Sequence, residues 1–272
     1  MSDSLLLRAM IDAALAAGRA ANRIYHTTFA VHTKADDSPV TAADHAAEEI
    51  ILEALTRHAS GIAVVAEEQV AAGHLPSIAD EFFLVDPLDG TKEFVQKRGD
   101  FTVNIALIRH GVPALGVVYA PATGQLFTGD VAAATARRAS LASDAAAAAD
   151  FTDLRVRKIP AAGITAVASR SHRTAQTDTY LAQYTVADLV AVGSSLKFCL
   201  VAAGEADLYP RLGPTMEWDT AAGQAVLLAA GGQVLGPQGQ PLRYGKPQFR
   251  NPWFVASGAF VPHALGDEGS GS

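Results

Sequence analysis

The feature that most constrains the fold is an apolar segment, residues 82–85, followed at once by a polar turn. The segment predicts a short strand that is buried on both faces, and the carboxylates of Asp86 and Asp89 come directly after it. Pro87 cannot extend a central strand, because proline has no backbone N–H to donate. We therefore expect both carboxylates at the carboxyl end of a buried strand, the edge where open α/β sheets form their binding crevices.

The turn itself, residues 86–91, carries features of an anion-binding site. Gly90 allows backbone N–H groups to approach an anion closely. Thr91 can begin a short helix whose N-terminus favours negative charge. Carboxylates are among the hard oxygen ligands that Mg²⁺ prefers. The pattern therefore predicts a magnesium ion that holds a phosphate at this turn.

Length and composition favour an enzyme with two closely packed halves. The 272 residues lie near the size at which one core divides into two, and 49% hydrophobic with 18% charged residues is typical of a soluble α/β protein. The net charge of −7 argues against nucleic-acid binding, which needs a basic surface. No apolar segment reaches the roughly 18 residues that span a bilayer. We therefore expect a cytoplasmic protein without a transmembrane segment, and leave open a peripheral association with the inner face of the membrane.

The first half of the chain is predicted to form helices followed by antiparallel strands. Apolar residues recur at helical spacing in residues 5–24 and 42–58, and Thr41 is placed to cap the second helix. A short apolar strand is expected at residues 61–66. Three further strands joined by short turns predict an antiparallel meander: residues 102–108, 114–119 and 125–128.

Residues 131–153 are rich in alanine and serine and have no bulky periodicity. We place the passage between two halves here; a surface excursion or an irregular helix within one domain is the alternative. Beyond it, strands alternate with helices, which favours a sheet covered by helices. The strands are expected at 164–168, 188–192 and 208–209, and the helices at 174–184, 194–203 and 220–230. The predicted division is an N-terminal half (1–150), a C-terminal half (151–265) and a flexible tail (266–272).

Two further carboxylates stand where apolar structure ends. Glu67 follows the strand predicted at residues 61–66, and Asp219 precedes a helical segment of small residues. Each alone has an ordinary explanation, a surface turn for Glu67 and a helix N-cap for Asp219. If these two converge with Asp86 and Asp89, cations must offset their mutual repulsion. Two or three Mg²⁺ ions would do so and leave positions for water and phosphate.

These motifs resemble those of a known family. Residues 67–68, 86–91 and 218–222 are similar, in order and spacing, to the signatures of the lithium-sensitive, magnesium-dependent phosphatases that include inositol monophosphatase and fructose-1,6-bisphosphatase. Four segments resemble the bacterial CysQ type, the 3′(2′),5′-bisphosphate nucleotidases: residues 34–44, 90–94, 169–172 and 193–198. The resemblance covers roughly residues 5–258. It implies a layered α/β (α+β) sandwich in which helix layers and sheet layers alternate.

The resemblance implies a set of metal ligands. Glu67, Asp86 and the carbonyl of Leu88 are expected to hold one Mg²⁺. Asp86, Asp89 and Asp219 are expected to hold a second, and Glu67 to share in a third, weaker site. Asp86 would then bridge two ions, which sets the short metal–metal spacing of an in-line displacement.

The resemblance also implies catalytic and substrate-binding residues. Asp44 and Thr91 are expected to orient and deprotonate the attacking water, and Glu67 to take part in catalysis through the third ion. The N–H groups of Gly90 and Thr91 are expected to bind the scissile phosphate. Four residues of the second half are expected to contact the nucleotide: His172, Ser195, Lys197 and, for the non-scissile phosphate, Arg211. Tyr209 is expected either to stack on adenine or to pack in the core.

The activity implied is hydrolysis of the 3′-phosphate of adenosine 3′,5′-bisphosphate to AMP, with 3′-phosphoadenylyl sulfate as a second substrate in sulfur metabolism. An inositol or sugar monophosphatase, or a regulatory protein-binding member of the same fold, is the alternative. The partner expected is a small nucleotide bisphosphate, with no nucleic acid, and the oligomeric state stays open. Residues 131–150 depart from the family pattern by being unusually rich in alanine. That departure leaves the interface between the halves less well defined than the metal site.

Overall fold

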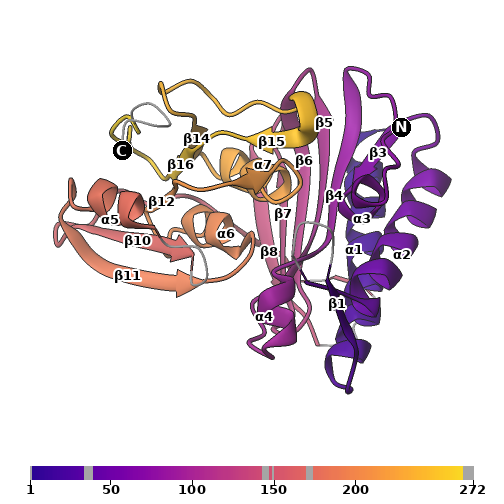
Figure 1. Ribbon diagram of the computed structural model, residues 1–272. Coiled ribbons are helices and arrows are strands. Elements are labelled where there is room, and N and C mark those ends of the chain that lie inside the picture. Colours follow the sequence, from indigo (N-terminus) through magenta and orange to yellow (C-terminus); the bar gives the residue numbers. More distant parts are fainter. Residues whose placement is uncertain (1, 34–38, 143–146, 149, 170–173, 266–272) are drawn as a thin grey trace.

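The helices and sheets of the protein are stacked in alternating layers. The computed structural model describes residues 2–33, 39–142, 147–148, 150–169 and 174–265. From one side of the molecule to the other, the layers are a pair of helices, a seven-stranded sheet, a second pair of helices, a five-stranded sheet and one outer helix (Figure 1). This is the layered arrangement that the resemblance to the phosphatase family implies.

The first layer consists of α1 (Asp3–Tyr25) and α2 (Ala42–His58), which pack against each other and against the large sheet. Alanines make up much of the buried face of α1, so its backbone can approach its neighbours closely. A capping box starts α2: Thr41 Oγ1 accepts from Ala43 N at 3.1 Å, and Asp44 Oδ2 accepts from Thr41 N at 2.8 Å. The cap fixes the position of Asp44 in the first turn.

The seven-stranded sheet contains the apolar segments of the first half. Its strands lie side by side in chain order: β3 (Ala63–Ala66), β4 (Glu81–Asp89), β5 (Thr102–Arg109), β6 (Val112–Ala120), β7 (Gln125–Asp130), β8 (Thr135–Ser140) and β9 (Thr152–Asp153). Strands β3 and β4 are parallel, and all other neighbours are antiparallel. The predicted meander of β5, β6 and β7 is confirmed.

Strand β4 is longer than predicted. It continues through Pro87 because Asp86 still pairs with Asn104 and Asp89 with Thr102, with a shift of register between the two pairs. Such an irregularity accommodates a proline, because the residues inside it need not donate to the ladder. Both aspartates nevertheless lie at the carboxyl end of the strand, as expected.

Residues 131–153 contain two strands rather than the surface excursion or irregular helix given as the alternative. Strand β8 pairs with β7, and β9 pairs with β8. Ala136 and Ala139 are the buried residues of β8, and such small side chains give no recognisable apolar alternation in the sequence. The division of the chain near residue 150 stays a prediction.

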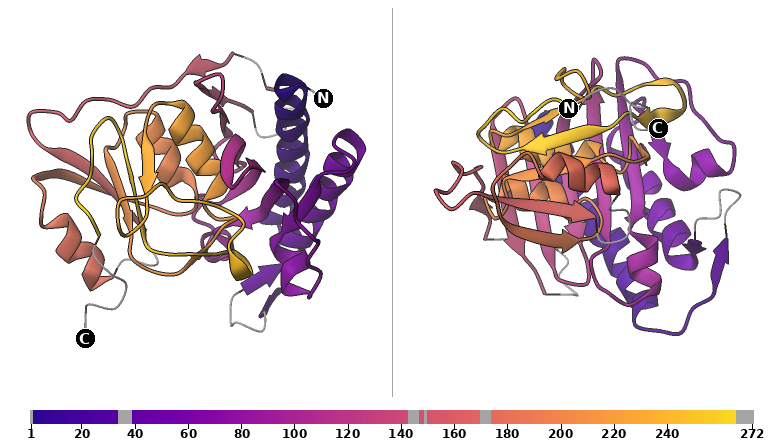
Figure 2. Two further views of the ribbon diagram at one scale, coloured as in Figure 1. Left: turned by 90° about the horizontal axis from the view of Figure 1, so that it is seen from above. Right: turned by 60° about the vertical axis from the view of Figure 1, so that its left-hand side comes forward.

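The second half builds a smaller sheet between helices. Its strands lie in the order β11 (Val186–Val192), β10 (Ile164–Ser169), β12 (Leu208–Arg211), β16 (Phe254–Ser257) and β14 (Gln233–Leu235). Helices α6 (Leu196–Ala202) and α7 (Ala221–Ala229) lie between the two sheets, and α5 (Ala175–Leu181) covers the outer face. Figure 2 shows the same layering from above. The predicted alternation of strands and helices is confirmed, whereas β14 and β16 were not predicted.

Short elements complete the fold. They are β1 (Val31–Thr33) paired with β2 (Pro39–Thr41), β13 (Thr215–Met216) paired with β15 (Arg250–Asn251), the helices α3 (Glu67–Ala71) and α4 (Thr91–Val95), and the 3-10 helix η1 (Pro247–Phe249). Within the described ranges, no helix has the length and apolar character needed to cross a membrane.

Two glycines of the large sheet let α7 lie directly on it. A Cβ atom at Gly116 would stand 2.5 Å from the carbonyl oxygen of Ala222, and one at Gly129 would stand 2.7 Å from that of Ala225. No side chain fits at such distances, so glycine is required where the helix backbone approaches the strands. Because Asp219 immediately precedes α7, this packing also sets how deeply Asp219 enters the molecule.

One hydrophobic core joins the two sheets. It contains Leu84 and Ile108 from the large sheet, Phe198 from α6, Val226 from α7 and Phe254 from the small sheet. Each of these side chains is at most 1% exposed, so the two sheets and the helices between them share one close-packed apolar interior. The functional groups carried by the two halves are therefore held in fixed relative positions.

Candidate active site

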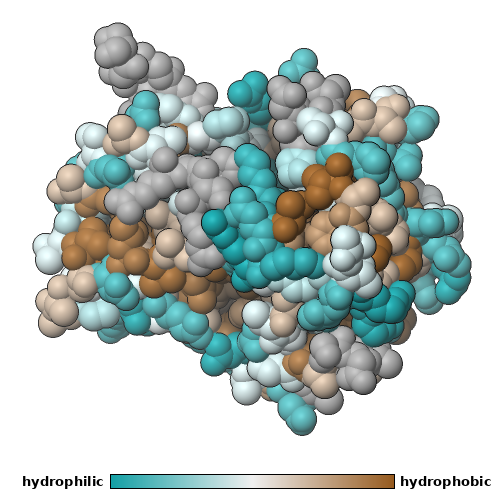
Figure 3. Space-filling model, turned by 60° about the horizontal axis from the view of Figure 1, so that its bottom comes forward, coloured by the Kyte–Doolittle hydropathy of each residue, from teal (hydrophilic) through white to brown (hydrophobic). Residues whose placement is uncertain are grey.

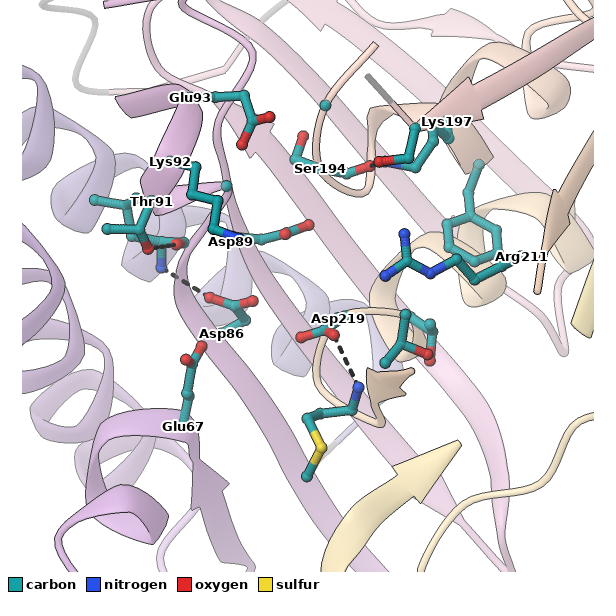
Figure 4. A pocket seen from close by; sticks show the side chains of 18 of the residues that line it. Glu67, Asp86, Asp89, Thr91, Lys92, Glu93, Ser194, Lys197, Arg211 and Asp219 are labelled. Atoms are coloured by element: carbon teal, nitrogen blue, oxygen red, sulfur yellow. Dashed lines mark hydrogen bonds between the residues drawn. The ribbon is translucent and has the colours of Figure 1, made fainter. Parts of the chain in front are cut away.

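A cavity of about 370 Å³ opens at the carboxyl end of β4. Its walls come from β4 and α4 on one side and from α6, β12 and the turn before α7 on the other (Figure 4). Figure 3 shows the side of the molecule on which α4 lies, with hydrophilic residues gathered between two hydrophobic areas. The charged residues that line the cavity are Glu67, Asp86, Asp89, Lys92, Glu93, Lys197, Arg211 and Asp219. The structure thus brings together the four carboxylates singled out in the sequence.

The end of β4 and the turn after it position Asp86. Its Oδ1 accepts a hydrogen bond from Leu88 N at 3.0 Å, which is an Asx turn, and the residue is 1% exposed. Gly90 follows with φ +92°, a left-handed conformation that favours glycine, and serves as N-cap of α4. The turn therefore directs Asp86, Asp89 and the first residue of α4 to one cavity.

Thr91 connects the cavity to the buried carboxylate of Asp44. The Thr91 hydroxyl lies 3.2 Å from Asp44 Oδ1 and 3.2 Å from the carbonyl oxygen of Leu88, and can donate its single hydrogen to either. The other oxygen, Asp44 Oδ2, accepts from Thr41 N and from Thr41 Oγ1, each at 2.8 Å. Asp44 is 1% exposed and lies behind the wall, whereas Thr91 lines the cavity.

Ser195 and Asn104 hold Asp89 from behind. Asn104 Nδ2 donates to Asp89 Oδ2 at 3.3 Å and to Ser195 Oγ at 2.9 Å. Ser195 Oγ in turn lies 3.1 Å from Asp89 Oδ2 and 2.7 Å from the carbonyl oxygen of Asp219. The side chain of Asp219 is held separately, because its Oδ2 accepts from Met216 N at 2.8 Å.

Burial and mutual repulsion raise the pKa values of three of these carboxylates. Burial raises the pKa of Asp86 well above its ordinary value, and the charges of Glu67, Asp89 and Asp219 raise it further. Burial likewise raises the pKa of Asp89, against the opposing effect of the Lys197 charge. The pKa of Asp219 is raised to about 8, first by burial and then by the charges of Asp89 and Glu67. A cluster of this kind gains stability from cations.

The donor set suits a hard divalent cation. The lining offers carboxylate oxygens, and no histidine or cysteine in the described ranges lines the cavity, which favours Mg²⁺ over Zn²⁺. The carboxylates stand on different walls. Among the described residues, no three acidic, histidine or cysteine side chains are grouped closely enough in this arrangement to hold one ion. The fit to a metal therefore rests on ligand chemistry and on the repulsion that a cation would relieve.

The wall across the cavity from Glu67 carries two buried cations, Lys197 and Arg211 (Figure 4). They are 5% and 9% exposed. Burial lowers the pKa of Lys197 to about 8, while the charge of Asp89 opposes that shift. Arg211 Nη2 donates to the carbonyl oxygen of Pro214 at 2.8 Å, and its buried Nε has no hydrogen-bond partner among the described residues. Carboxylates and buried cations therefore line the same cavity.

Tyr209 belongs mainly to the core. Its ring lies nearly perpendicular to those of Phe198 and Phe254, with centroids 5.1 and 5.6 Å away. The residue is 3% exposed, although it contributes to the lining of the cavity. Core packing thus accounts for most of its surface.

Most of the residues predicted from the sequence meet at this cavity. Those that line it are Glu67, Asp86, Leu88, Asp89, Gly90, Thr91, Lys197, Arg211 and Asp219. Asp44 and Ser195 lie behind the lining, each in contact with a residue that belongs to it. His172 lies outside the described residues.

Two residues of the site were missed. Asn104 is a polar residue within the apolar segment 103–108, and that contrast was the available signal. Ser194 lines the cavity with φ +52°, which is unusual for a residue other than glycine and typical of functional loops. No local pattern around Ser194 indicates that conformation.

Comparisons with known proteins agree with this geometry. The model of the inositol monophosphatase family matches residues 3–258. The chain is 44% identical over 244 residues to the 3′(2′),5′-bisphosphate nucleotidase CysQ of Shigella flexneri, an alignment that covers 89% of this chain and 95% of that protein.

Solved structures show the same relationship. CysQ from Bacteroides thetaiotaomicron superimposes with a TM-score of 0.79 and 38% identity, covering 94% of this chain and 97% of that one. An inositol monophosphatase from Anabaena sp. PCC 7120 superimposes with a TM-score of 0.71 and 26% identity, covering 93% and 90%. The chain belongs to the inositol monophosphatase family.

Proposed function

We propose that this chain is a Mg²⁺-dependent 3′(2′),5′-bisphosphate nucleotidase, which hydrolyses adenosine 3′,5′-bisphosphate to AMP and inorganic phosphate. The observation that carries the proposal is that one cavity is lined both by carboxylates and by two buried cations, Lys197 and Arg211. A scissile phosphate held at the carboxylates through metal ions would leave a second phosphate in need of cations from the protein, and lysine and arginine are the usual partners. A relative with 44% identity is a nucleotidase of this kind, which supports the same substrate class.

Five oxygen donors are assigned to two or three Mg²⁺ ions: Glu67, Asp86, the Leu88 carbonyl, Asp89 and Asp219. Bound Mg²⁺ would supply positive charge to the phosphate oxygens and lower the pKa of a water molecule. The chain holds these donors on the walls of one cavity, at the cost of crowding like charges. The raised pKa values of Asp86 and Asp219 express that cost.

Asp44 and Thr91 are assigned to the attacking water. The Thr91 hydroxyl lies 3.2 Å from Asp44 Oδ1, so it can donate to Asp44 while it accepts from a water molecule in the cavity. Because Thr41 holds Asp44 Oδ2, the carboxylate keeps its orientation. As the water oxygen forms a bond to phosphorus, the water proton moves towards Asp44 through the hydroxyl. The bond to the 3′-oxygen breaks, and that oxygen takes a proton from solvent water to leave as the 3′-hydroxyl of AMP.

The substrate assignments divide between the two walls. The N–H groups of Gly90 and Thr91 are assigned to the scissile phosphate, where backbone donors stabilise charge on its oxygens. Lys197 and Arg211 are assigned to the 5′-phosphate; Arg211 Nε has no partner among the described residues and so remains a donor for it. Ser195 and His172 stay assigned to the nucleotide by family resemblance. 3′-Phosphoadenylyl sulfate presents the same 3′-phosphate and is the proposed second substrate.

Phosphate release with Mg²⁺ tests the substrate class. Adenosine 3′,5′-bisphosphate, 3′-AMP and inositol 1-phosphate are compared at equal concentration, and the bisphosphate is expected to have the highest kcat/KM. Comparable turnover of inositol 1-phosphate, without preference for the bisphosphate, would identify a general monophosphatase instead. No hydrolysis of any of the three would indicate a regulatory, protein-binding member of the fold.

Arg211→Gln tests the basic wall. Loss of hydrogen bonds to a charged phosphate is expected to lower kcat/KM for the bisphosphate about 10- to 100-fold, because that substrate alone carries the 5′-phosphate. Turnover of 3′-AMP should stay near the wild-type value, which separates recognition from damage to the fold. Arg57→Gln, at an exposed arginine on α2, is the matched control and should leave both substrates unaffected. Equal losses on both substrates would contradict the assignment.

A further inference from the structure

We propose that Asn104 is a positioning residue that fixes the carboxylate of Asp89 for metal binding and, through Ser195, couples it to Asp219. The proposal rests on the metal-dependent function above, but it concerns a residue that neither lines the cavity nor contacts the substrate. It is argued from the burial of Asn104, the two groups that its side-chain amide joins, and an oxygen atom of the same amide that has no partner among the described residues.

Asn104 occupies a position where an apolar residue is expected. It lies near the start of β5 and is 0% exposed. It pairs directly with Asp86 across the antiparallel ladder, so the two side chains lie on the same face of the sheet. Two residues further along β5, Ala106 belongs to the core between the sheets, which is the face covered by α6 and α7. The sheet thus presents a single buried amide to the second half of the chain at this point.

The amide of Asn104 donates to two groups at once. Nδ2 lies 3.3 Å from Asp89 Oδ2 and 2.9 Å from Ser195 Oγ. An ionised carboxylate only accepts hydrogen bonds, so the nitrogen, not the oxygen, of the amide must face Asp89. Ser195 Oγ reaches the same carboxylate oxygen at 3.1 Å. Asn104 Nδ2 therefore donates to Oδ2, and the single hydrogen of the Ser195 hydroxyl can be donated either to that oxygen or to the carbonyl oxygen of Asp219.

The same contacts extend to the second half of the site. Ser195 Oγ lies 2.7 Å from the carbonyl oxygen of Asp219. Asp89 and Asn104 come from the large sheet, whereas Ser195 precedes α6 and Asp219 precedes α7. A shift of α6 or α7 against the sheet would break one of these contacts. Asn104 therefore fixes the relative positions of two proposed metal ligands that lie 130 residues apart in the chain.

The other end of the Asn104 amide argues against a purely structural role. Oδ1 is buried and has no hydrogen-bond partner among the described residues. A buried unpaired acceptor costs about 1–3 kcal/mol, so an apolar residue of similar shape would suit the core at least as well. The hydrogen bonds that Nδ2 donates to Asp89 and Ser195 account for an amide at this position.

Asn104→Leu removes the donor and the unpaired oxygen together at similar volume. Binding of Mn²⁺ to the protein without nucleotide is measured by the electron paramagnetic resonance signal of the unbound ion. Loss of a group that orients a metal ligand is expected to weaken Mn²⁺ binding about 10- to 100-fold. The denaturant midpoint of the metal-free protein should stay at or above the wild-type value. A structural role predicts the reverse, a lower midpoint with unchanged Mn²⁺ affinity.

Asn22→Leu is the matched control. Asn22 is also a buried asparagine with an unpaired Oδ1 among the described residues, but it lies on α1. Its replacement should leave Mn²⁺ affinity unchanged. Mn²⁺ affinity within twofold of wild type in Asn104→Leu, or an equal loss in Asn22→Leu, would overturn the proposal.

A double-mutant cycle tests the pathway through Asp89. Ser195→Ala deletes only one atom, the hydroxyl oxygen that contacts Asp89 Oδ2. It therefore tests the positioning of the same carboxylate even if Asn104→Leu does not fold. Ser195→Ala alone is expected to weaken Mn²⁺ binding, and the double variant to weaken it by less than the product of the two single effects, because both act on one carboxylate. The proposal would be overturned if the two substitutions changed Mn²⁺ affinity in a fully multiplicative way, or if Ser195→Ala left Mn²⁺ affinity unchanged. Since no nucleotide is present, the outcome is independent of whether the bisphosphate is the substrate.

Discussion

Two fully buried aspartates, Asp207 and Asp86, have opposite surroundings, although each is 1% exposed. Asp207 accepts hydrogen bonds from Arg157 Nε at 2.9 Å and Nη2 at 2.8 Å, and from Thr165 N at 2.7 Å. Asp86 accepts one from Leu88 N at 3.0 Å, and its charged neighbours are other acids, which raise its pKa after burial has done so. One acid is neutralised within the fold, and the other is crowded by like charges.

The contrast indicates which acids serve the fold and which serve the site. Buried charges normally have a partner of opposite sign, because removal from water is otherwise too costly. Asp207 follows that rule, and its arginine ties residues before β10 to the turn before β12. Asp86 violates it, and the pKa of Asp219 is raised by the charges of Asp89 and Glu67, whereas the charge of Lys197 partly compensates Asp89; all three aspartates line one cavity. Such a concentration of unfavourable burial marks a functional site, and here it points to a cation from outside the chain.

The largest expected effect is that of Asp86→Asn on activity. The change removes one proposed bridging ligand at nearly constant volume, so a loss of about 10³-fold in kcat is expected, equal to several kcal/mol of metal-derived stabilisation. The free energy of unfolding without metal should be unchanged or higher, because one of several repelling charges is gone. Phosphate release and denaturant titration in EDTA measure the two quantities. Near-normal turnover would remove Asp86 from the ligand set.

Asp207→Asn should show the opposite pattern with a smaller effect. It leaves Arg157 without its charged partner, and we expect a loss of about 2–3 kcal/mol in the free energy of unfolding. The kcat of the folded fraction should match wild type, because Asp207 does not line the cavity. Denaturant titration and a phosphate-release assay at a temperature where both proteins are folded give the comparison. A variant that kept its stability while losing activity would mean that the two kinds of acid cannot be told apart by their partners.

The sequence predicted those parts of the fold in which bulky apolar residues set the period. The meander of β5, β6 and β7 is of this kind, and so is the helix capped by Thr41. Strand β8 was missed because its buried residues are alanines, and β16 because its four residues become a strand only by pairing with β12 and β14. Both depend on neighbours that are distant in the chain, which no local pattern reveals.

The site was predictable to the extent that its residues stand at the ends of apolar segments. Asp86, Asp89 and Glu67 could be singled out by that position alone. Asn104 could not, because its partner Ser195 lies 91 residues further along the chain and reaches it only when α6 packs on the sheet. The left-handed backbone of Ser194 is likewise a product of that packing. What the sequence did not reveal are the contacts that hold these carboxylates in place.

Glu48 offers an intermediate case with the smallest expected effect. It is 3% exposed and accepts a hydrogen bond from Glu68 N at 2.9 Å, so its partner is a backbone group instead of a cation. Burial raises its pKa from 4.5 to about 7, and the N–H of Glu68 opposes the shift. A folded-state pKa above the unfolded value gives stability that is fully present below about pH 4.5 and is lost as the pH rises through about 7.

Glu48→Gln cannot ionise and should lack this loss. Relative to the variant, wild type is expected to lose roughly 1–2 kcal/mol in its free energy of unfolding between about pH 5 and pH 8. Denaturant titrations of both proteins across that range, in EDTA to exclude metal binding, measure the difference. Parallel curves would show that backbone donors satisfy the Glu48 carboxylate, although the charges of Glu68 and Glu67 also raise its pKa. A buried acid with backbone partners would then need no cation, and the property that distinguishes the site would be the gathering of several acids around one cavity.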